Sequence, residues 1–307
     1  MAGVKEIRNK IEGITETQKI TSAMYLIAST KLRKARERLD NTMPYFRALK
    51  EDISVIFSNI ESVGETVNSV FFLPEGIEED EDTPLPGKYA YLVITADKGL
   101  AGEYNHRVIK EAERLLKGHD DNALYVVGEN GRAYFSAHGY EIEKSFLYTA
   151  QNPTMERARE ICDHIIKAYV NREISKIYLV YTEFGNGLNP KCVSERLLPF
   201  HRAHFNEIPG TSETLFEFIP STTEVLDNII QNYVIGYVYC ALIDSYCSEQ
   251  NARMVAMDNA NQNAAEMLEQ LKLQHNHARQ GEITQEITEI SSGARALKRN
   301  SGRGGKR

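Results

Sequence analysis

The sequence predicts an α/β protein, in which long N- and C-terminal helices form an antiparallel coiled coil and a mainly parallel α/β domain is inserted between them. Residues 1–60 follow one heptad repeat, and helical apolar spacing returns over 221–297. Between these regions, short β-branched runs alternate with helical patterns. Neither terminal apolar seam can stay in water alone, and the simplest way to bury both is to pair the two helices.

The N-terminal helix is indicated by a strict alternation of three- and four-residue steps between apolar positions. Gln18, Thr21 and Thr42 are its polar exceptions. At ~1.5 Å per residue such a helix spans roughly 85 Å, more than one compact domain needs. Pro44 lacks a backbone donor, so we expect a kink or local break there. The seam positions are Val4, Ile7, Ile11, Ile14, Gln18, Thr21, Tyr25, Ala28, Leu32, Ala35, Leu39, Thr42, Phe46, Leu49, Ile53, Ile56 and Ile60.

A second long helix is predicted over 221–297. Ser221 can serve as its N-cap, with Glu224 completing a capping box. After Gly281 the apolar phase shifts, which locally changes a supercoil. The stretch 298–307 is basic and glycine-rich, and we expect a disordered tail. The seam reads Leu226, Ile229, Tyr233, Gly236, Cys240, Ile243, Met254, Met257, Asn261, Ala264, Leu268, Leu271, His275 and Ala278, then Ile283, Ile287, Ile290, Ala294 and Leu297.

The α/β domain is predicted to span 88–220, after an acidic linker over 61–87 whose carboxylates lie among prolines and glycines. Strands that alternate with helices imply a Rossmann-like, mainly parallel sheet covered on both faces. Strand candidates are 89–96, 123–128, 145–148 and 176–184; helical patterns cover 104–117 and 154–170; antiparallel edge or hairpin candidates are 192–200 and 215–219.

Composition narrows the function. The net charge of −7 argues against a general nucleic-acid binder. No window approaches the ~20 apolar residues of a spanning helix, and the polar N-terminus carries no signal-peptide pattern. The cysteines Cys162, Cys192, Cys240 and Cys247 show no C-x-x-C spacing, which favours reduced thiols.

Motifs that would carry enzyme chemistry are weak. The stretch TADKGLAGEYN (95–105) follows a strand, where ligands bind in doubly wound sheets, but no phosphate loop is present and a tight turn is the simpler interpretation. His201 and His204 have H-x-x-H spacing without further ligands nearby, and His275 and His277 lie on different sides of a helix. We therefore expect no metal, no cofactor and no direct nucleotide binding.

Two polar features of the helices need an explanation. The basic cluster Lys31, Arg33, Lys34, Arg36 and Arg38 fits a solvated coiled-coil face, an electrostatic face toward an acidic partner, or a nucleic-acid surface, the last disfavoured by the acidic chain. The second feature is a set of polar residues in the seams, namely Gln18, Thr21, Asn261 and His275. Polar residues at such positions lower the stability of a coiled coil and usually set its register or its choice of partner.

Two long terminal stretches resemble the signatures of the gamma subunit of F-type ATP synthases, in its bacterial form. They are VKEIRNKIEGITETQKITSAMYLIASTKLRKAR (4–36) and SEQNARMVAMDNANQNAAEMLEQLKLQHNHARQGEITQEITEISSGA (248–294). In addition, ITADKGLAGEYN (94–105) is similar to the turn that follows a strand in this family, and VVGENGRAYF (126–135) to its second strand and turn.

The resemblance implies a non-catalytic central-stalk rotor rather than a coiled-coil adaptor or a nucleotide-binding enzyme, the two alternatives. In that family the paired helices turn inside a hexamer of alpha and beta subunits, and the α/β domain stands on the membrane c-ring beside the epsilon subunit. Rotation of the c-ring, driven by ion flow, is thereby coupled to ATP synthesis and hydrolysis. We expect a peripheral protein at the cytoplasmic face of the cell membrane.

The resemblance also implies which residues of this chain make the contacts that couple rotation to catalysis in the family. The N-terminal ones, expected to face the acidic lever of the beta subunits, are Lys19, Ile20, Thr21 and Met24. The C-terminal ones are Arg253, Arg279, Gln280, Thr284 and Glu286. The basic stretch Lys31, Arg33, Lys34 and Arg36 is expected to meet acidic stator surface. Where the family tends to show Y-x-Y-E-P at its foot, Phe216–Pro220 reads FEFIP and lacks the Glu before the proline.

Overall fold

The computed structural model describes residues 3–64, 69–73, 84–185, 190–206 and 216–303, and the chain forms two compact units. One unit contains Met1–Ile27 and Val255–Arg307, and the other contains Ala28–Met254. Two long helices, α1 (Val4–Val63) and α6 (Thr222–Arg303), contribute to both units. None of the described helices is long and apolar enough to cross a membrane.

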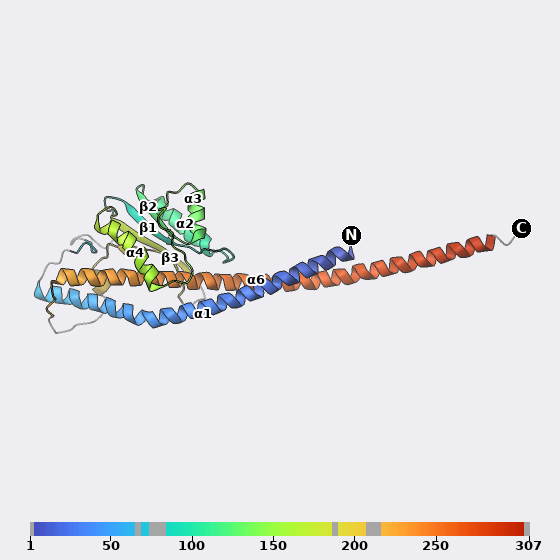
Figure 1. Ribbon diagram of the computed structural model, residues 1–307, viewed down its shortest axis with the longest axis horizontal. Helices are drawn as coiled ribbons and strands as arrows, with labels where there is room; N and C mark the ends of the chain where they lie inside the picture. Colours follow the sequence, from blue (N-terminus) through green and yellow to red (C-terminus); the bar gives the residue numbers. More distant parts are fainter. Residues whose placement is uncertain (1–2, 65–68, 74–83, 186–189, 207–215, 304–307) are drawn as a thin grey trace. The chain divides into compact units, whose positions relative to one another are not determined.

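The larger unit is built on a four-stranded sheet in the order β2-β1-β3-β4 (Figure 1). Strand β1 pairs in parallel with β2 and β3, and β4 pairs antiparallel with β3, so the predicted mainly parallel sheet is confirmed. The candidate 145–148 is not a strand, and neither are residues 216–219 of the candidate 215–219, whose first residue lies outside the described residues. The strands are β1 (Tyr89–Ile94), β2 (Asn122–Val127), β3 (Lys176–Glu183) and β4 (Lys191–Leu198).

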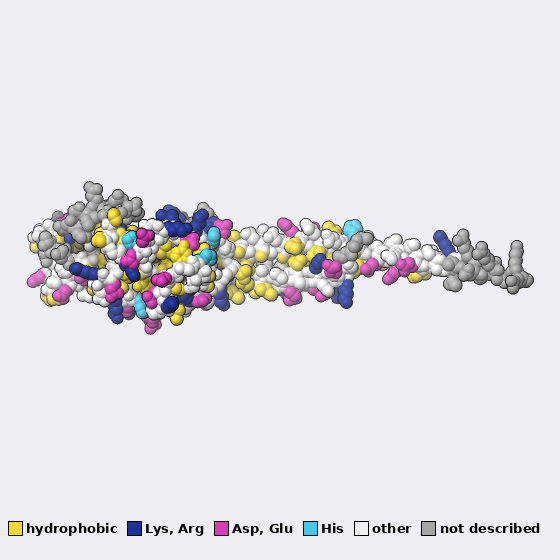
Figure 2. All heavy atoms as spheres, turned by 90° about the horizontal axis from the view of Figure 1, so that it is seen from above, with side chains coloured by type: hydrophobic (Ala, Val, Ile, Leu, Met, Phe, Trp, Pro, Cys, Tyr) yellow, Lys and Arg dark blue, Asp and Glu magenta, His cyan; other side chains and the backbone are white. Residues whose placement is uncertain are grey.

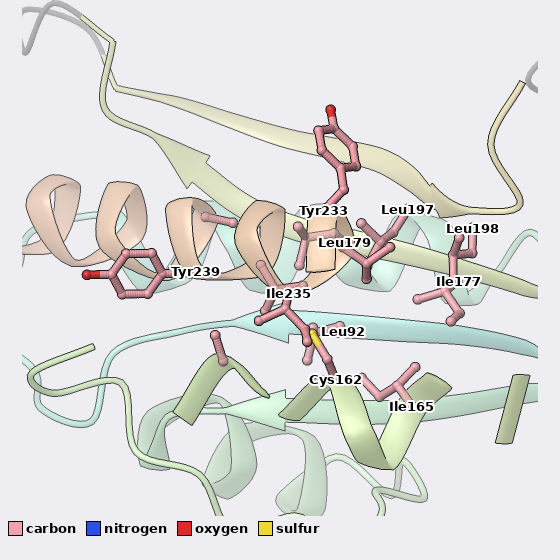
Figure 3. Close-up of a cluster of buried hydrophobic side chains, with 14 of the residues drawn as sticks. Leu92, Cys162, Ile165, Ile177, Leu179, Leu197, Leu198, Tyr233, Ile235 and Tyr239 are labelled. Atoms are coloured by element: carbon pink, nitrogen blue, oxygen red, sulfur yellow. The ribbon is translucent and has the colours of Figure 1, made fainter. Parts of the chain in front are cut away.

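Helices cover both faces of this sheet. Side chains alternate along a strand, so Tyr89, Tyr91 and Val93 of β1 pack with α2 (Tyr104–Leu116) and α3 (Glu129–Ala137). Ala90, Leu92 and Ile94 belong to the second core, with α4 (Met155–Val170) and parts of α1 and α6. Figure 3 shows Leu92 and Leu179 beside Cys162 of α4 and Ile235 of α6. The sheet is therefore buried on both faces, which explains its continuously apolar strands.

Helix α6 also completes the hydrogen bonding of the sheet. The pairing of β1 with β3 ends at Val93 and Val180, so Thr182 lies beyond the end of β1. The backbone N–H of Thr182 donates to the Ser245 hydroxyl at 3.2 Å, and the Ser248 hydroxyl donates to the Thr182 carbonyl at 3.3 Å. Because buried backbone groups need partners, these two serines fix α6 in register against β3.

The predicted heptad of α1 is reproduced by the burial pattern: every seam position from Val4 to Ile60 is buried or half-buried. The predicted N-cap of α6 is also present, since the Glu224 N–H donates to the Ser221 hydroxyl at 3.3 Å. Helix α1 continues through Pro44 without the expected break. Pro44 and Asp40 are both exposed, so water can bond the carbonyl that proline leaves free.

Two further segments differ from their sequence interpretation. Within the predicted linker 61–87, Phe71 and Phe72 are buried, and the Phe200 N–H donates to the Phe71 carbonyl at 2.8 Å. The acidic residues 75–82 lie outside the described residues. Helix α6 continues to Arg303, into the stretch predicted as disordered, because no proline interrupts it; residues 304–307 lie outside the described part. The predicted division of the chain into two terminal helices, a linker, an α/β domain and a tail stays a prediction.

A close contact between α1 and α6 in the larger unit, at Phe46 and Gly236, gives the first testable prediction. A Cβ atom on Gly236 would lie 1.7 Å from the Phe46 ring. We expect Gly236→Ala to lower the free energy of unfolding by about 1–3 kcal/mol, because the buried Phe46 must move.

Gly13→Ala is the matched control, because nothing lies within 4 Å of the Cβ position at this helical glycine. We expect a gain of about 0.5–1 kcal/mol there. Urea titration monitored by circular dichroism measures both variants, and equal stabilities would contradict the tight packing at Gly236.

Candidate functional site

The polar residues of the predicted seam meet one another in the smaller unit. Gln18 donates through Nε2 to the Asn261 carbonyl at 3.4 Å, and the Ser22 hydroxyl donates to Asn261 Oδ1 at 3.3 Å. The Thr21 hydroxyl also contacts Asn261 Oδ1. A polar layer of this kind pairs only in one register, so the structure supports a register role for Gln18, Thr21 and Asn261.

The surface beside this polar layer is apolar and weakly charged. Ile20 is 60% exposed, and Ile27, seven residues later on the same helical face, is also exposed. Met24 is half-buried between them, and Lys19 is exposed and paired with Glu16 at 2.9 Å. Figure 2 shows hydrophobic side chains, in yellow, along the exposed surface of the helices. Exposed apolar residues gathered in this way are typical of a protein contact surface.

Beyond Ala278, helix α6 is exposed on every side that the structure describes, through residue 295. The apolar seam predicted after Gly281 is therefore not covered by α1. Helix α1 has 60 residues and α6 has 82, so α1 is too short to accompany α6 along its whole length. Ile283, Ile287 and Ile290 form an exposed stripe on one helical face. The predicted contact residues Arg279, Gln280, Thr284 and Glu286 are exposed on this same segment.

Arg253 is placed differently from the other predicted contact residues. Its side chain is buried, with Nη1 2.6 Å from Glu249 Oε1. Its Nη2 donates to the carbonyls of Gly99 at 3.1 Å and Lys98 at 3.4 Å. Burial raises the pKa of Glu249, while the Arg253 charge opposes that shift. The structure therefore brings Arg253 together with the 97–102 turn inside the larger unit.

The turn after β1 is held from its other side by Asp97. Asp97 Oδ1 accepts the Glu129 N–H and Oδ2 accepts the Gln151 N–H, each at 3.1 Å, and the Thr149 hydroxyl also contacts Oδ2. Toward α6 the turn presents carbonyl oxygens, which accept hydrogen bonds and do not cradle phosphate as N–H groups do. The geometry favours the tight-turn interpretation of 95–105 over a nucleotide site.

Part of the basic cluster of α1 lies near the segment that holds Asp97, because its cleft is also lined by Gln151, whose N–H bonds Asp97. Lys31, Lys34 and Arg38 line a cleft of about 320 Å³ together with Asn152. Arg38 Nη1 donates to Asn152 Oδ1 at 2.8 Å. Arg33 and Arg36 are exposed, and the Arg36 guanidinium lies 5.9 Å from the Phe184 ring centroid. Exposed cations at one cleft are suited to an acidic partner.

The remaining motifs show no metal-binding arrangement in the described part of the chain, where no group of three or more His, Cys, Asp or Glu side chains could hold an ion. The ring of His204 packs near Phe200 and Phe205. Sequence reasoning missed the exposed Ile27 and Leu100. For Ile27 a signal was available, because it is apolar and lies outside the heptad seam.

The half-buried Asp244 on α6 generates a pH prediction. Burial, with the Glu183 charge second, raises the pKa of Asp244 to about 7. The folded state then holds this proton between about pH 4 and pH 7, where the unfolded chain has lost it, so the Asp244 contribution to stability falls as pH rises through this window.

We expect Asp244→Asn to raise the free energy of unfolding at pH 8 by about 1–3 kcal/mol and to leave it nearly unchanged at pH 4. Urea titrations at the two pH values measure the difference. An equal effect of the substitution at both would show that Asp244 does not titrate in this way.

Comparison with known proteins gives matches over nearly the whole chain. A family model described as ATP synthase matches residues 3–297. The ATP synthase gamma chain of Ruminiclostridium cellulolyticum is 40% identical over 299 residues, covering 96% of this chain and 98% of that protein.

Two solved structures are similar as well. The central stalk and c-ring structure of the Tetrahymena thermophila mitochondrial ATP synthase contains a chain with 25% identity and a TM-score of 0.56, covering 78% of this chain and 99% of that one. A chain of the Euglena gracilis mitochondrial ATP synthase has 16% identity and a TM-score of 0.64, covering 97% and 95%, and supports the fold alone.

Proposed function

Because this chain belongs to the ATP synthase gamma chain family and is a central-stalk subunit, we propose that it is the rotor that couples ion-driven c-ring rotation to ATP synthesis and hydrolysis. Its partners are the alpha and beta subunits of the catalytic hexamer, the c-ring and the epsilon subunit. It acts as a peripheral protein on the cytoplasmic face of the membrane and carries no catalytic site itself. The Tetrahymena thermophila structure described as central stalk and c-ring, whose similar chain is 25% identical, supports the c-ring as one of these partners.

The observation that carries the proposal is the unpaired apolar stripe of α6. Ile283, Ile287 and Ile290 are exposed on a helix that α1 no longer accompanies. Exposed apolar residues in water are unfavourable, and a ring of surrounding subunits would cover them. A lone helix of this kind suits a central position, because all its sides can face the same ring.

The paired part of the helices supplies the contact side chains. Ile20 and Met24 offer an apolar surface with little charge, and Lys19 lies beside it. An apolar surface of this kind can pass several equivalent neighbours in turn, since it fixes no charge pair with one of them. We propose that Lys19, Ile20, Thr21 and Met24, with Arg279, Gln280, Thr284 and Glu286, contact the catalytic hexamer. The basic residues Lys31, Arg33, Lys34 and Arg36 meet acidic surface on the same ring.

The end of the α/β domain near Phe216 is the proposed contact with the c-ring. Phe216 is held by Asn59, whose Nδ2 donates to the Phe216 carbonyl at 3.1 Å and whose Oδ1 accepts the Phe216 N–H at 3.0 Å. Ile219 is 83% exposed. Ile219 stands where the family usually has a glutamate. We therefore expect the contact with the c-ring to be less polar in this chain than in its relatives.

A reconstitution experiment tests the rotor function. The full chain is mixed with an alpha–beta hexamer, and ATP hydrolysis and complex formation are measured. The rotor proposal predicts a stable complex with a changed hydrolysis rate. Binding to the hexamer without any change in the hydrolysis rate would instead favour a coiled-coil adaptor. Binding of nucleotide by the isolated chain, measured by calorimetry, would favour a nucleotide-binding enzyme.

Met24→Lys tests the coupling surface. The added charge would face the acidic lever of a beta subunit, and an attractive pair at one angular position hinders passage to the next. We expect fewer ions pumped per ATP hydrolysed, with assembly intact, measured in membrane vesicles.

Met24→Leu is the control, because it keeps the volume and adds no charge. Equal pumping ratios for the Lys and Leu variants would contradict the placement of Met24 at this surface.

A further inference from the structure

The cleft of about 320 Å³ in the larger unit is lined by residues of α1, of the loop 151–153 and of α6. This volume falls at the lower end of the roughly 300–1,000 Å³ that small-molecule sites usually have. Lys31, Lys34 and Arg38 of α1 all line it, and none of the described residues around it is an aspartate or a glutamate. The cleft is therefore suited to a small anion.

The three cations lie on one face of α1. Lys34 follows Lys31 by three residues and Arg38 follows Lys34 by four, which is the spacing of neighbours on a helix surface. Among the described residues, neither lysine forms an ion pair or a side-chain hydrogen bond, and like charges at this spacing repel each other. Between Lys31 and Arg38 the helix rises about 10 Å, so the three cations match two linked phosphate groups better than a single one.

The carbonyl groups of the loop 151–153 are bonded by a further cation. Arg157 Nη1 donates to the Gln151 carbonyl at 2.5 Å and to the Asn152 carbonyl at 3.4 Å. Carbonyl oxygens repel an anion, and the Arg157 charge offsets this repulsion. Asn152 has φ of 49°, in the left-handed region that asparagine tolerates. Its Oδ1 accepts a hydrogen bond from Arg38 at 2.8 Å, which joins the loop to α1.

Tyr246 of α6 supplies a buried polar group to the same cleft. It is 8% exposed, and its hydroxyl has no hydrogen-bond partner in the part of the chain that the structure describes. A buried tyrosine hydroxyl usually has a partner, and a ligand in the cleft would provide one. Burial, with the Glu249 charge second, raises the pKa of Tyr246, while the Arg253 and Arg38 charges oppose that rise. The hydroxyl is therefore protonated at neutral pH and can donate to an anion.

We propose that this cleft binds a diphosphate group, with Lys31, Lys34 and Arg38 as its charge partners and the Tyr246 hydroxyl as a hydrogen-bond donor. Hydrogen bonds from lysine and arginine to phosphate are among the strong ones in proteins. Lys31 and Lys34 also belong to the basic stretch proposed to meet acidic surface, so a bound diphosphate and that surface would compete for them. The binding itself does not depend on the proposed rotor function.

Isothermal titration calorimetry of the isolated full chain tests the proposal, with inorganic pyrophosphate as the probe. We expect saturable binding of one pyrophosphate per chain. Lys34→Gln should weaken this affinity at least about tenfold, because it removes one charge-assisted bond. Arg47→Gln is the matched control, since Arg47 is an exposed cation of α1 outside the cleft and its loss changes the net charge equally. If pyrophosphate does not bind, or if both variants weaken its binding equally, the proposal is wrong.

Tyr246→Phe tests the site without changing any charge. It removes a hydroxyl that bonds none of the described residues, so the thermal midpoint of the ligand-free chain should stay unchanged. We expect the affinity for pyrophosphate to fall about tenfold, because a hydrogen bond to a charged group is lost. An unchanged affinity would show that the anion does not occupy this cleft.

Titration with ADP distinguishes the two sources of a diphosphate group. Binding of ADP that Lys34→Gln weakens at least about tenfold would identify a nucleotide as a ligand of this cleft. It would also separate the cleft from the catalytic site that the enzyme alternative requires. Binding of pyrophosphate without ADP would identify the free anion as the ligand. Either result supports the proposal, whereas failure of both probes to bind overturns it and leaves the rotor function untouched.

Discussion

The burial of α6 on nearly all sides within the larger unit is the constraint on which the rest depends. From Tyr233 to Gln250 every residue of the helix is buried or half-buried. A helix enclosed in this way cannot rotate about its own axis without exposing apolar surface on one side and colliding on the other. Gly236 against Phe46 fixes its approach to α1, and Ser245 and Ser248 fix its register on β3.

This fixed register determines where the functional side chains point. Once Ser248 is bonded to Thr182, Glu249 and Arg253 lie on adjacent turns of the same helix and face the end of β1. The turn after β1 is where an open α/β sheet usually binds a ligand. Here the side chain of Arg253, from α6, occupies that position. The carboxyl end of β1 therefore binds α6 instead of a ligand.

Much of the fold could be predicted from the sequence because it follows periodicity. The heptad from Val4 to Ile60, the N-cap Ser221 and the strand at 89–94 each depend on local patterns that tertiary contacts reinforce. The burial of Phe71 and Phe72 was not predicted, because their partner Phe200 lies far away in the sequence. The unpaired stripe beyond Ala278 also escaped, because periodicity reports an apolar face and not whether a second helix is long enough to cover it.

The placement of Arg253 shows why residue roles are harder to infer than folds. The resemblance to the family assigned Arg253 to the coupling contacts with a partner, and that assignment stays a prediction. A buried arginine needs both a counter-ion and acceptors for its remaining donors, and Glu249, Gly99 and Lys98 provide them. An arginine already satisfied in this way would have to break these contacts before binding another subunit. A contact of Arg253 with another subunit would therefore have to offset the loss of its bonds to Glu249, Gly99 and Lys98.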